Sequence, residues 1–303
     1  MSENASRRIK RRDLLGTTLK IATGTAVVGG GTFGYMTLFE PANIDVEVMP
    51  LLLPRLEAEF HGYRIAQLSD IHVDNSWMDL ARLQYIVNLT NQQRPDLIVI
   101  TGDFVTRYYS DAPAILAALG GLEARDGVLA ILGNHDYWSG ADWVRSIIKP
   151  LGIQDLTNTY HTIKRRNGAT LHLVGIDDLW PKPRLRYPIT QNKPALQQIT
   201  DRMPDKGAAI LLAHEPDFAD ITAANGRFDL QLSGHSHGGQ VNVPFIGPPI
   251  TPALGQKYAS GLYHVGSLLQ YTNRGLGMVK PQIRFNCQPE ITVIQCVSPE
   301  AKG

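Results

Sequence analysis

Short apolar segments alternate with amphipathic ones along the chain from about residue 60. The segments YRIAQLSD (63–70), PDLIVITGD (95–103) and GVLAILGNHD (127–136) have the apolar character and length of buried strands. Between them, MDLARLQYIVNLTNQQ (78–93) and APAILAALGGL (112–122) carry apolar residues at helical spacing, and glycines close the second of these. Buried strands that alternate with helices predict an α/β fold with parallel strands.

The same alternation continues in the second half of the chain. LHLVGIDD (171–178), AAILLAHEP (208–216) and FDLQLSGHSH (228–237) are strand-like, and KPALQQITDRM (193–203) is helical in pattern. The C-terminal segment QIRFNCQPEITVIQC (282–296) alternates as strands do, and we expect it to close a second sheet.

Polar residues gather where the predicted strands end. Asp70 and Asp103 are 33 residues apart, and Asp103 and Asn134 are 31 apart, which is the length of a βαβ unit. In open α/β sheets, ligands bind at the carboxyl ends of parallel strands. We therefore expect these polar side chains to meet at one edge of the fold.

Five of the nine histidines lie at such strand ends, together with two aspartates and an asparagine. Each residue has an ordinary structural alternative. Asp103 or Asp136 could cap a helix, and His214 could be a buried histidine whose ring nitrogens are hydrogen-bonded. Carboxylate and imidazole without cysteine are ligands for Mn²⁺, Fe or Zn²⁺. Seven ligands exceed one tetrahedral site and suit two ions that share a carboxylate. The candidate ligands are Asp70, His72, Asp103, Asn134, His214, His235 and His237.

Composition adds few constraints. Hydrophobic residues make up 43% of the 303 residues and charged ones 19%, which is ordinary for a globular protein rather than a disordered one. The net charge of +1 gives no global field that would attract nucleic acid, and we expect no nucleic-acid partner. The two cysteines, Cys287 and Cys296, either form a disulfide in an oxidising compartment or are buried as small apolar residues.

The first forty residues differ from the rest. SRRIKRRDLLG (6–16) carries five of the six basic residues in positions 1–20, and positions 21–39 contain no charge. A basic head before an apolar stretch is typical of an export signal or an anchor. Arg11-Arg12 followed by Asp13-Leu14-Leu15 resembles a twin-arginine signal.

The charge-free stretch would span roughly 28 Å as a helix, close to the roughly 30 Å of a hydrocarbon core. Its five glycines and four threonines disfavour a transmembrane helix, and no A-x-A cleavage site follows. We predict that residues 1–40 are a signal that stays as a membrane anchor, the alternative being a disordered basic tail. Residues 41–303 would form the catalytic domain, exported by the twin-arginine route to the periplasm or outer face of the cytoplasmic membrane.

The ordered motifs DxH, GD, GNHD, H and GHxH resemble those of the calcineurin-like metallophosphoesterase family. GHSHGGQ, GLYHVG and NRGLGM also resemble an exported phosphodiesterase branch of it. The resemblance implies a four-layer αββα sandwich, with two central mixed sheets flanked by helices. It implies that Asp70, His72 and His237 hold one metal, that Asn134, His214 and His235 hold a second, and that Asp103 bridges them.

The resemblance also implies that His135 is the catalytic residue. A hydroxide that bridges the metals would attack phosphorus in line, and His135 would protonate the departing oxygen. The chain departs from many family members at Thr106, where an acid or histidine commonly pairs with the catalytic histidine. We expect Asp136 or a water to orient His135 instead. Arg107 is a candidate for binding a phosphate oxygen, the alternative being a solvated surface arginine.

Three functions fit these residues. The first is a phosphodiesterase that depends on two divalent metals. The second is a lipid-linked pyrophosphatase similar to the enzymes that cleave UDP-2,3-diacylglucosamine, and the third is a non-catalytic envelope protein with structural metals. The proline-rich loops 177–189 and 243–255 carry aromatic, apolar and basic residues that would receive an acyl chain and a diphosphate, or would merely connect strands.

Overall fold

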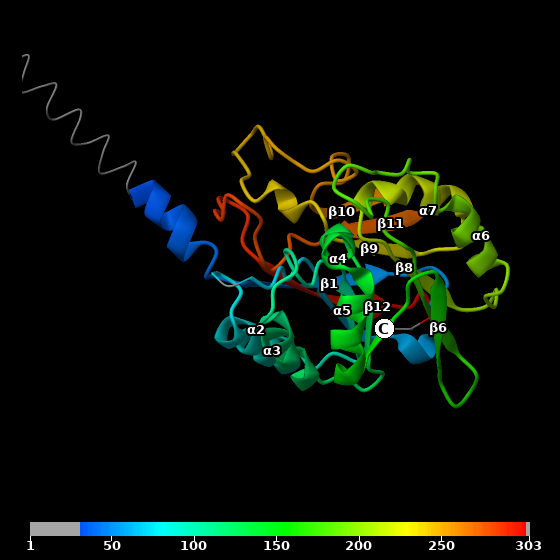
Figure 1. Ribbon diagram of the computed structural model, residues 1–303. Coiled ribbons are helices and arrows are strands. Elements are labelled where there is room, and N and C mark those ends of the chain that lie inside the picture. The colour runs from blue at the N-terminus through cyan, green and yellow to red at the C-terminus, as the bar shows by residue number, and fades with distance from the viewer. Residues whose placement is uncertain (1–30, 75, 301–303) are drawn as a thin grey trace, which may run out of the picture.

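Two six-stranded sheets form the centre of the computed structural model, which describes residues 31–74 and 76–300 (Figure 1). The first sheet has the order β1-β12-β2-β3-β4-β5 and the second β10-β11-β9-β8-β7-β6. The strands of the first sheet, in that order, are Asp45–Leu52, Glu290–Val297, Arg64–Leu68, Leu97–Thr101, Val128–Ile131 and Ile153–Asp155. Those of the second are Gly261–Val265, Leu268–Thr272, Leu230–Ser233, Ala208–Leu212, Thr170–Gly175 and Thr159–Lys164.

Both sheets are mixed. Strands β2 to β5 run parallel, as do β7, β8, β9 and β11, whereas β12 is antiparallel to β2, and β6 and β10 are antiparallel edge strands. A helical segment lies in the chain between most of the parallel neighbours, such as β2 and β3 or β7 and β8, as βαβ connectivity requires.

Helices cover the outer faces of the two sheets (Figure 1). Residues of α2 (Leu80–Gln92), α3 (Ala112–Leu116) and α5 (Ala141–Ile148) pack on the first sheet, and those of α6 (Lys193–Thr200) and α7 (Ala219–Asn225) on the second. The remaining short helix is α4, at Asn134–Ser139. A π-helical turn lies at Tyr35–Phe39, and 3-10 turns at Ala58–Phe60, Ala117–Gly121, Lys149–Leu151, Pro216–Phe218 and His237–Gly239.

Strand β3 shows why the fold has four layers. Ile98 and Ile100 face the helices of the first sheet, while Leu97 and Val99 face the second sheet. All four side chains are fully buried. Because successive strand residues point to opposite faces, an unbroken apolar run needs cover on both sides. The four layers that the resemblance implied are therefore present.

The C-terminal segment does not close the second sheet, and that prediction was wrong. Strand β12 lies in the first sheet, parallel to β1 and antiparallel to β2, and residues 282–287 form only an isolated bridge, between Phe285 and Val241. Ile291 of β12 packs under the helices and Ile294 packs between the sheets, so both of its faces are buried. That pattern fits either sheet, and the choice of partner depends on tertiary contacts.

Two other predictions concern features at the ends of the chain. Residues 1–30 of the predicted anchor lie outside the described residues; residues 31–39 are helical. Across 31–74 and 76–300, no helix is both long and apolar enough to cross a membrane. Cys287 and Cys296 are both free and buried, so they are buried as small apolar residues and do not form a disulfide.

Candidate metal centre

The ends of five strands bring all seven candidate metal ligands together. Strands β2, β3 and β4 of the first sheet lead into Asp70, His72, Asp103 and Asn134, and β8 and β9 of the second lead into the three other histidines. None of the seven residues is more than 5% exposed. The site therefore lies where the carboxyl ends of strands from both sheets meet. The residues are Asp70, His72, Asp103, Asn134, His214, His235 and His237.

The backbone is strained at most of these positions. Asp70, His72, Asp103, His235 and His237 all have φ between 49° and 68°, the left-handed region that residues with a Cβ rarely adopt. Such a conformation costs free energy and persists only where surrounding contacts enforce it. The strain turns the chain sharply after each strand, which directs these side chains inward rather than along the sheet.

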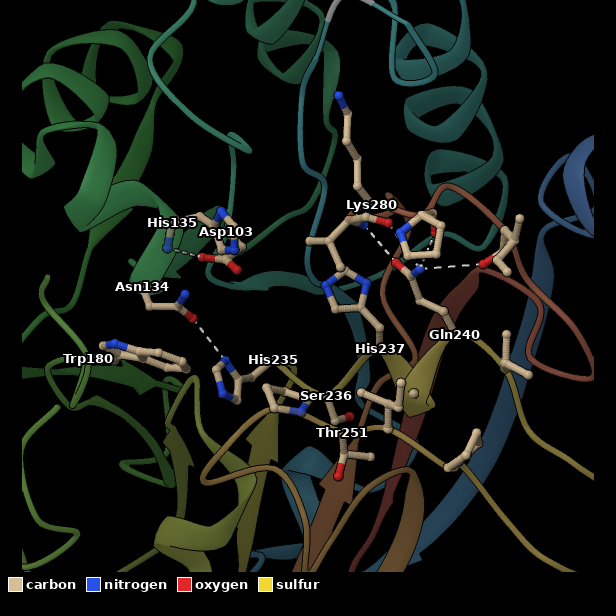
Figure 2. Close-up of a pocket in the computed structure, with 18 of the residues that line it drawn as sticks. Asp103, Asn134, His135, Trp180, His235, Ser236, His237, Gln240, Thr251 and Lys280 are labelled. Carbon is tan, nitrogen blue, oxygen red and sulfur yellow. Dashed lines mark hydrogen bonds between the residues drawn. The ribbon is translucent and has the colours of Figure 1, made fainter. Parts of the chain in front are cut away.

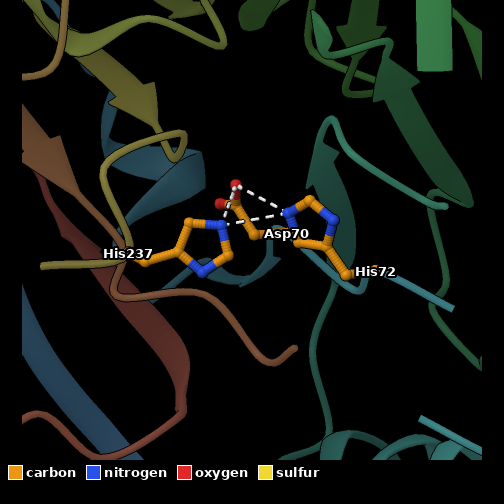
Figure 3. Close-up of side chains that lie close together, drawn as sticks. All are labelled: Asp70, His72 and His237. Carbon is orange, nitrogen blue, oxygen red and sulfur yellow. Dashed lines mark hydrogen bonds and ion pairs between the residues drawn. The ribbon is translucent and has the colours of Figure 1, made fainter. Parts of the chain in front are cut away.

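Asp70, His72 and His237 form one group of converging ligand atoms (Figure 3). Asp70 Oδ1 lies 3.3 Å from His237 Nε2 and 3.9 Å from His72 Nε2. The two Nε2 atoms are 3.0 Å apart. Two imidazole nitrogens and a carboxylate oxygen thus face a common point.

A second group lies on the other side of Asp103. Asp103 Oδ2 is 3.4 Å from His72 Nε2 and 3.3 Å from His214 Nε2, so the same oxygen faces both groups. Asn134 Oδ1 lies 3.2 Å from His214 Nε2 and 2.9 Å from His235 Nδ1. One carboxylate oxygen of Asp103 therefore lies between the two groups of ligand-type atoms.

Hydrogen bonds orient two of the histidine rings. Nδ1 of His214 lies 2.7 Å from the carbonyl oxygen of Thr101, and Nε2 of His235 lies 2.9 Å from that of Ala253. A carbonyl only accepts, so each of these ring nitrogens carries a proton. The opposite nitrogen of His235 presents a lone pair to the site, and that of His214 does so once its second proton is lost. This arrangement is the usual one behind histidines that bind metal.

Burial sets the protonation of several of these groups. It lowers the pKa of His72 and of His235 to about 3 and raises the pKa of Asp70 to about 6. Burial also acts to lower the pKa of His214, but the charge of Asp103 outweighs it and the pKa rises. His72 and His235 are therefore neutral at pH 7, the form in which imidazole binds a metal.

The donor set fits divalent cations. Two ligand atoms that each lie about 2.1 Å from the same ion are roughly 3 Å apart. The distances between the ligand atoms around Asp103 and His237 are similar. Nδ1 of His237 is buried without a hydrogen-bond partner among the described residues. Oxygen and nitrogen ligands without sulfur suit Mn²⁺, Fe or Zn²⁺.

His135 is placed beside the ligands by the first turn of α4. Its backbone N–H donates to Asp103 Oδ1 at 2.8 Å, and its ring Nδ1 lies 2.7 Å from the carbonyl oxygen of Thr106. The prediction that Asp136 orients the ring was wrong: its carboxylate accepts the backbone N–H groups of Gly133 and Val105. The Thr106 carbonyl holds the proton on Nδ1 and leaves Nε2 free.

Two cavities flank His135. The first, of about 410 Å³, is mostly apolar, and Figure 2 shows part of its wall. Trp138, 4.5 Å from His135 between ring centroids, and Trp180 line it together with Val241, Pro249, Ile250, Pro252, Val279, Pro281 and Ile283. The second, of about 480 Å³, contains the exposed side chains of Arg107 and Lys280. His135 thus lies between a mostly apolar cavity and a second one that holds Arg107, and Lys280 lines both.

Sequence reasoning missed the segment that packs on Asp70 and His72 from behind. At Gly275, where φ is +73°, a Cβ would lie 2.8 Å from Asp70 Cβ, and at Gly277 it would lie 2.7 Å from His72 Cβ. The fully buried Arg284 holds this segment through the carbonyl oxygens of Gly275, at 2.9 Å, and Gly277, at 2.7 Å. The stretch NRGLGM contained the signal, but glycines and an arginine are equally common in exposed loops.

The chain is similar in sequence to known proteins. The family model of the calcineurin-like phosphoesterases matches residues 63–239. An uncharacterized metallophosphoesterase of Bacillus subtilis, YkuE, is 35% identical over 94% of this chain and 96% of its own length. The phosphodiesterase YaeI of Escherichia coli is 31% identical over 95% of this chain and 99% of its own length.

A third relative has a named substrate. The UDP-2,3-diacylglucosamine pyrophosphatase LpxG of Chlamydia trachomatis is 30% identical over 88% of this chain and 93% of its own length. The matched residues 63–239 include every candidate ligand and His135. The chain therefore belongs to the calcineurin-like phosphoesterase family and is a hydrolase.

Proposed function

We propose that this hydrolase is a phosphodiesterase that uses two divalent metal ions. The observation that carries the proposal is the position of Asp103, whose Oδ2 lies within 3.4 Å of ring nitrogens from both ligand groups. Asp70, His72 and His237 would hold one ion, Asn134, His214 and His235 the other, and Asp103 both. When bound, such ions polarise a phosphoryl oxygen and supply an activated water at neutral pH.

His135 would act as the general acid. Because Nδ1 lies against the Thr106 carbonyl, Nε2 is the atom that can give a proton to the departing oxygen. The ligand atoms of His72, Asp103 and His135 lie within 4.8 Å of one another, so that oxygen can reach the ring and the metals together. A residue in this role lowers the barrier most for strongly basic leaving groups.

The apolar cavity supports a substrate with an apolar portion. Trp138 and Trp180, 5.2 Å apart between ring centroids, offer a surface to acyl or aromatic groups. This observation favours a second candidate, hydrolysis of a lipid-linked pyrophosphate, which the name of the Chlamydia trachomatis relative also supports. In that case Arg107, in the second cavity, would bind the additional phosphate. The relatives named as enzymes argue against a non-catalytic envelope protein.

The N-terminal residues support an assignment to the cell envelope. We infer from Arg11-Arg12 and the charge-free positions 21–39 that the chain is exported folded by the twin-arginine route and stays anchored at the outer face of the cytoplasmic membrane. Replacing both arginines by lysine should retain active protein inside the cell. Unchanged export of that double variant would remove this part of the proposal.

A substrate panel tests the proposed reaction. Protein stripped with a chelator should be inactive, and Mn²⁺, Zn²⁺ or Fe²⁺ should restore hydrolysis of bis(p-nitrophenyl) phosphate to well above that of p-nitrophenyl phosphate. Metal analysis of the most active preparation should approach two ions per chain. Greater activity on the monoester, or full activity with one ion, would contradict the proposal; preference for a lipid-linked pyrophosphate would select the second candidate.

A further inference from the structure

Three large apolar side chains project from the loop that joins His237–Gly239 to β10. Phe245 is fully exposed, Ile246 is 79% exposed and Ile250 is 78% exposed. Apolar groups gathered at one tip in this way commonly mark a surface that contacts a partner or a membrane.

The tip has a defined shape. Ile246 and Gly247 both donate backbone hydrogen bonds to the carbonyl oxygen of Val243, at 3.1 and 2.8 Å, and close a tight turn. Phe245 adopts φ of 69° within it. A bulky residue held in the left-handed region at a turn tip is presented outward at a conformational cost, and this indicates a role outside the protein's own core.

The tip stands at the mouth of the apolar cavity. Ile250 of the tip lines that cavity itself, together with Pro249 and Pro252 of the same loop. Thr251, from the same loop, faces the cavity in Figure 2. A group that contacts the tip is therefore next to the opening that leads toward His135.

The N-terminal helix lies beside the same loop. The backbone N–H of Arg284 donates to the carbonyl oxygen of Met36 at 2.9 Å, and the neighbouring Phe285 N–H donates to Gln240 at the start of the loop, also at 2.9 Å. Residues 284–285 thus connect the helix to the loop. Figure 1 shows the helix extending away from the sheets. Phe33, Tyr35, Leu38 and Phe39 are its large exposed apolar and aromatic side chains.

Basic side chains follow Trp180, which lines another part of the same cavity. Lys182, Arg184 and Arg186 are exposed on the segment after Trp180, and Arg186 lies over the Trp180 ring at 5.9 Å. Within residues 31–74 and 76–300 none of these three cations forms an ion pair with an acid. Exposed apolar groups beside unpaired cations are the combination that binds the interface of an anionic bilayer.

We propose that Phe245, Ile246 and Ile250, with the exposed face of residues 33–39, form a lipid-contacting surface that places the cavity mouth on an anionic bilayer. The charge-free positions 21–39 lead into this helix and supply the argument for lipid over a second copy of the chain. Two copies that met through this surface would also bring their cations together. It follows, resting on the proposed function, that the preferred substrate is an amphiphilic phosphate ester or pyrophosphate whose apolar portion enters the cavity from the membrane.

Site-specific labelling tests the lipid contact. Because Cys287 and Cys296 are buried, a cysteine introduced by Phe245→Cys can be labelled selectively with an environment-sensitive fluorophore. In full-length protein reconstituted into phosphatidylcholine–phosphatidylglycerol vesicles, nitroxide-labelled lipid should quench this label. Tyr85→Cys, on the outer face of α2 and 54% exposed, is the matched control and should not be quenched. Absence of quenching at position 245, or self-quenching between labelled chains in place of quenching by lipid, would overturn the proposal.

Kinetics test the consequence for substrate. The double variant Phe245→Ser with Ile246→Ser should hydrolyse a long-chain alkyl p-nitrophenyl phosphodiester in vesicles roughly tenfold more slowly than wild type. Its rate on soluble bis(p-nitrophenyl) phosphate should be unchanged, since neither residue lines the cavity. Equal rates on the vesicle substrate would refute membrane entry. If the wild type had no diester activity, the proposed function would be refuted instead. The lipid-contacting surface would then be tested by the quenching experiment alone.

Discussion

The two carboxylate oxygens of Asp103 have different partners. Oδ1 accepts the backbone N–H of His135 at 2.8 Å, while Oδ2 faces His72 and His214. One side chain therefore fixes the start of the helix that carries His135 and also joins the two ligand groups. Because one residue does both, loss of the carboxylate should disturb metal binding and the position of the acid together, whereas loss of the His135 ring should disturb only the acid.

His135→Asn tests the acid separately from the metals. We expect turnover of a diester with a basic leaving group to fall by about 10²–10⁴-fold, with metal content unchanged. The loss should be smaller for p-nitrophenyl esters, whose leaving group needs little protonation. Turnover measured against leaving-group pKa, beside metal analysis, checks this expectation. His264→Asn, on the exposed edge strand β10, is the control and should behave as wild type; an equal loss on all esters would contradict the assignment.

At the scale of elements, the connections after the strands determine the site more than the strands themselves do. The segment 274–287 packs on the ligands from outside both sheets, and Arg284 donates to its carbonyl groups without an acid partner among the described residues. A small residue is required wherever this segment approaches Asp70 or His72, so its sequence should affect metal affinity although it contributes no ligand.

Gly275→Ala should weaken metal binding. The added Cβ meets Asp70 Cβ at 2.8 Å, so the segment or the ligand must shift. Gly266→Ala is a close control, since Gly266 also has positive φ, at +62°, but has open space around it. Both variants should lose about 1 kcal/mol of stability from backbone strain, and only Gly275→Ala should need more Mn²⁺ for half-maximal activity. Equal metal requirements in the two variants would argue against this packing role.

A charged contact ties the β6–β7 hairpin to the first sheet. Asp126, before β4, accepts hydrogen bonds from Arg165 at 2.9 Å and from the Tyr63 hydroxyl at 2.8 Å. Burial acts to raise the pKa of Asp126, but the hydrogen bond from Arg165 and its other donors outweigh it and the pKa is lowered. When the pKa of a carboxyl is lower in the folded than in the unfolded chain, the ionised group stabilises the fold at pH values above the unfolded pKa. This stabilisation is lost as the pH falls through the folded-state pKa.

Asp126→Asn should therefore destabilise the protein by about 1 kcal/mol at pH 7, and the difference from wild type should shrink as the pH falls below about 4. Urea unfolding at a series of pH values measures this. The exposed Asp205→Asn serves as the control, with little effect at either end of the range. A difference that stays constant with pH would mean that packing, rather than charge, is lost.

At the scale of the whole molecule, the candidate ligands come from both sheets. Asp70 and Asp103 follow strands of the first sheet, and His214 and His237 follow strands of the second. Ions bound between them would link the two halves of the core across the site. A metal ion that binds only the folded state stabilises the protein. The gain in free energy of unfolding grows with the logarithm of the ratio of the metal concentration to the dissociation constant of the metal.

Metal removal should lower the melting temperature, and adding Mn²⁺ back should restore it in a concentration-dependent way. Thermal unfolding monitored by circular dichroism, with and without chelator, gives the comparison. His135→Asn should keep the metal-dependent shift, whereas Asp103→Asn should lose most of it. A melting temperature that is indifferent to metal in the wild type would show that no ion links the sheets.

Much of the site could be predicted from sequence because its residues follow apolar runs. Asp70 and Asp103 end strands whose burial is evident from Ile65 to Leu68 and from Leu97 to Ile100, and parallel strands bring their ends together. The partner of His135 could not be predicted, because it is the backbone carbonyl of Thr106, which side-chain identity does not encode. The place of β12 was missed because its two buried faces fit either sheet.

The place of β12 has a consequence for the order of events during synthesis. Residues 290–297 are inserted between β1 and β2, two strands made more than two hundred residues earlier. Until the ribosome has released this late strand, β2 has no neighbour on that side, and the turn that carries Asp70 and His72 lacks part of its support. The ligand groups therefore have their full support only after residues 290–297 have been made. Metals bound between these groups would accordingly be acquired after that strand has paired, in whichever compartment the pairing takes place.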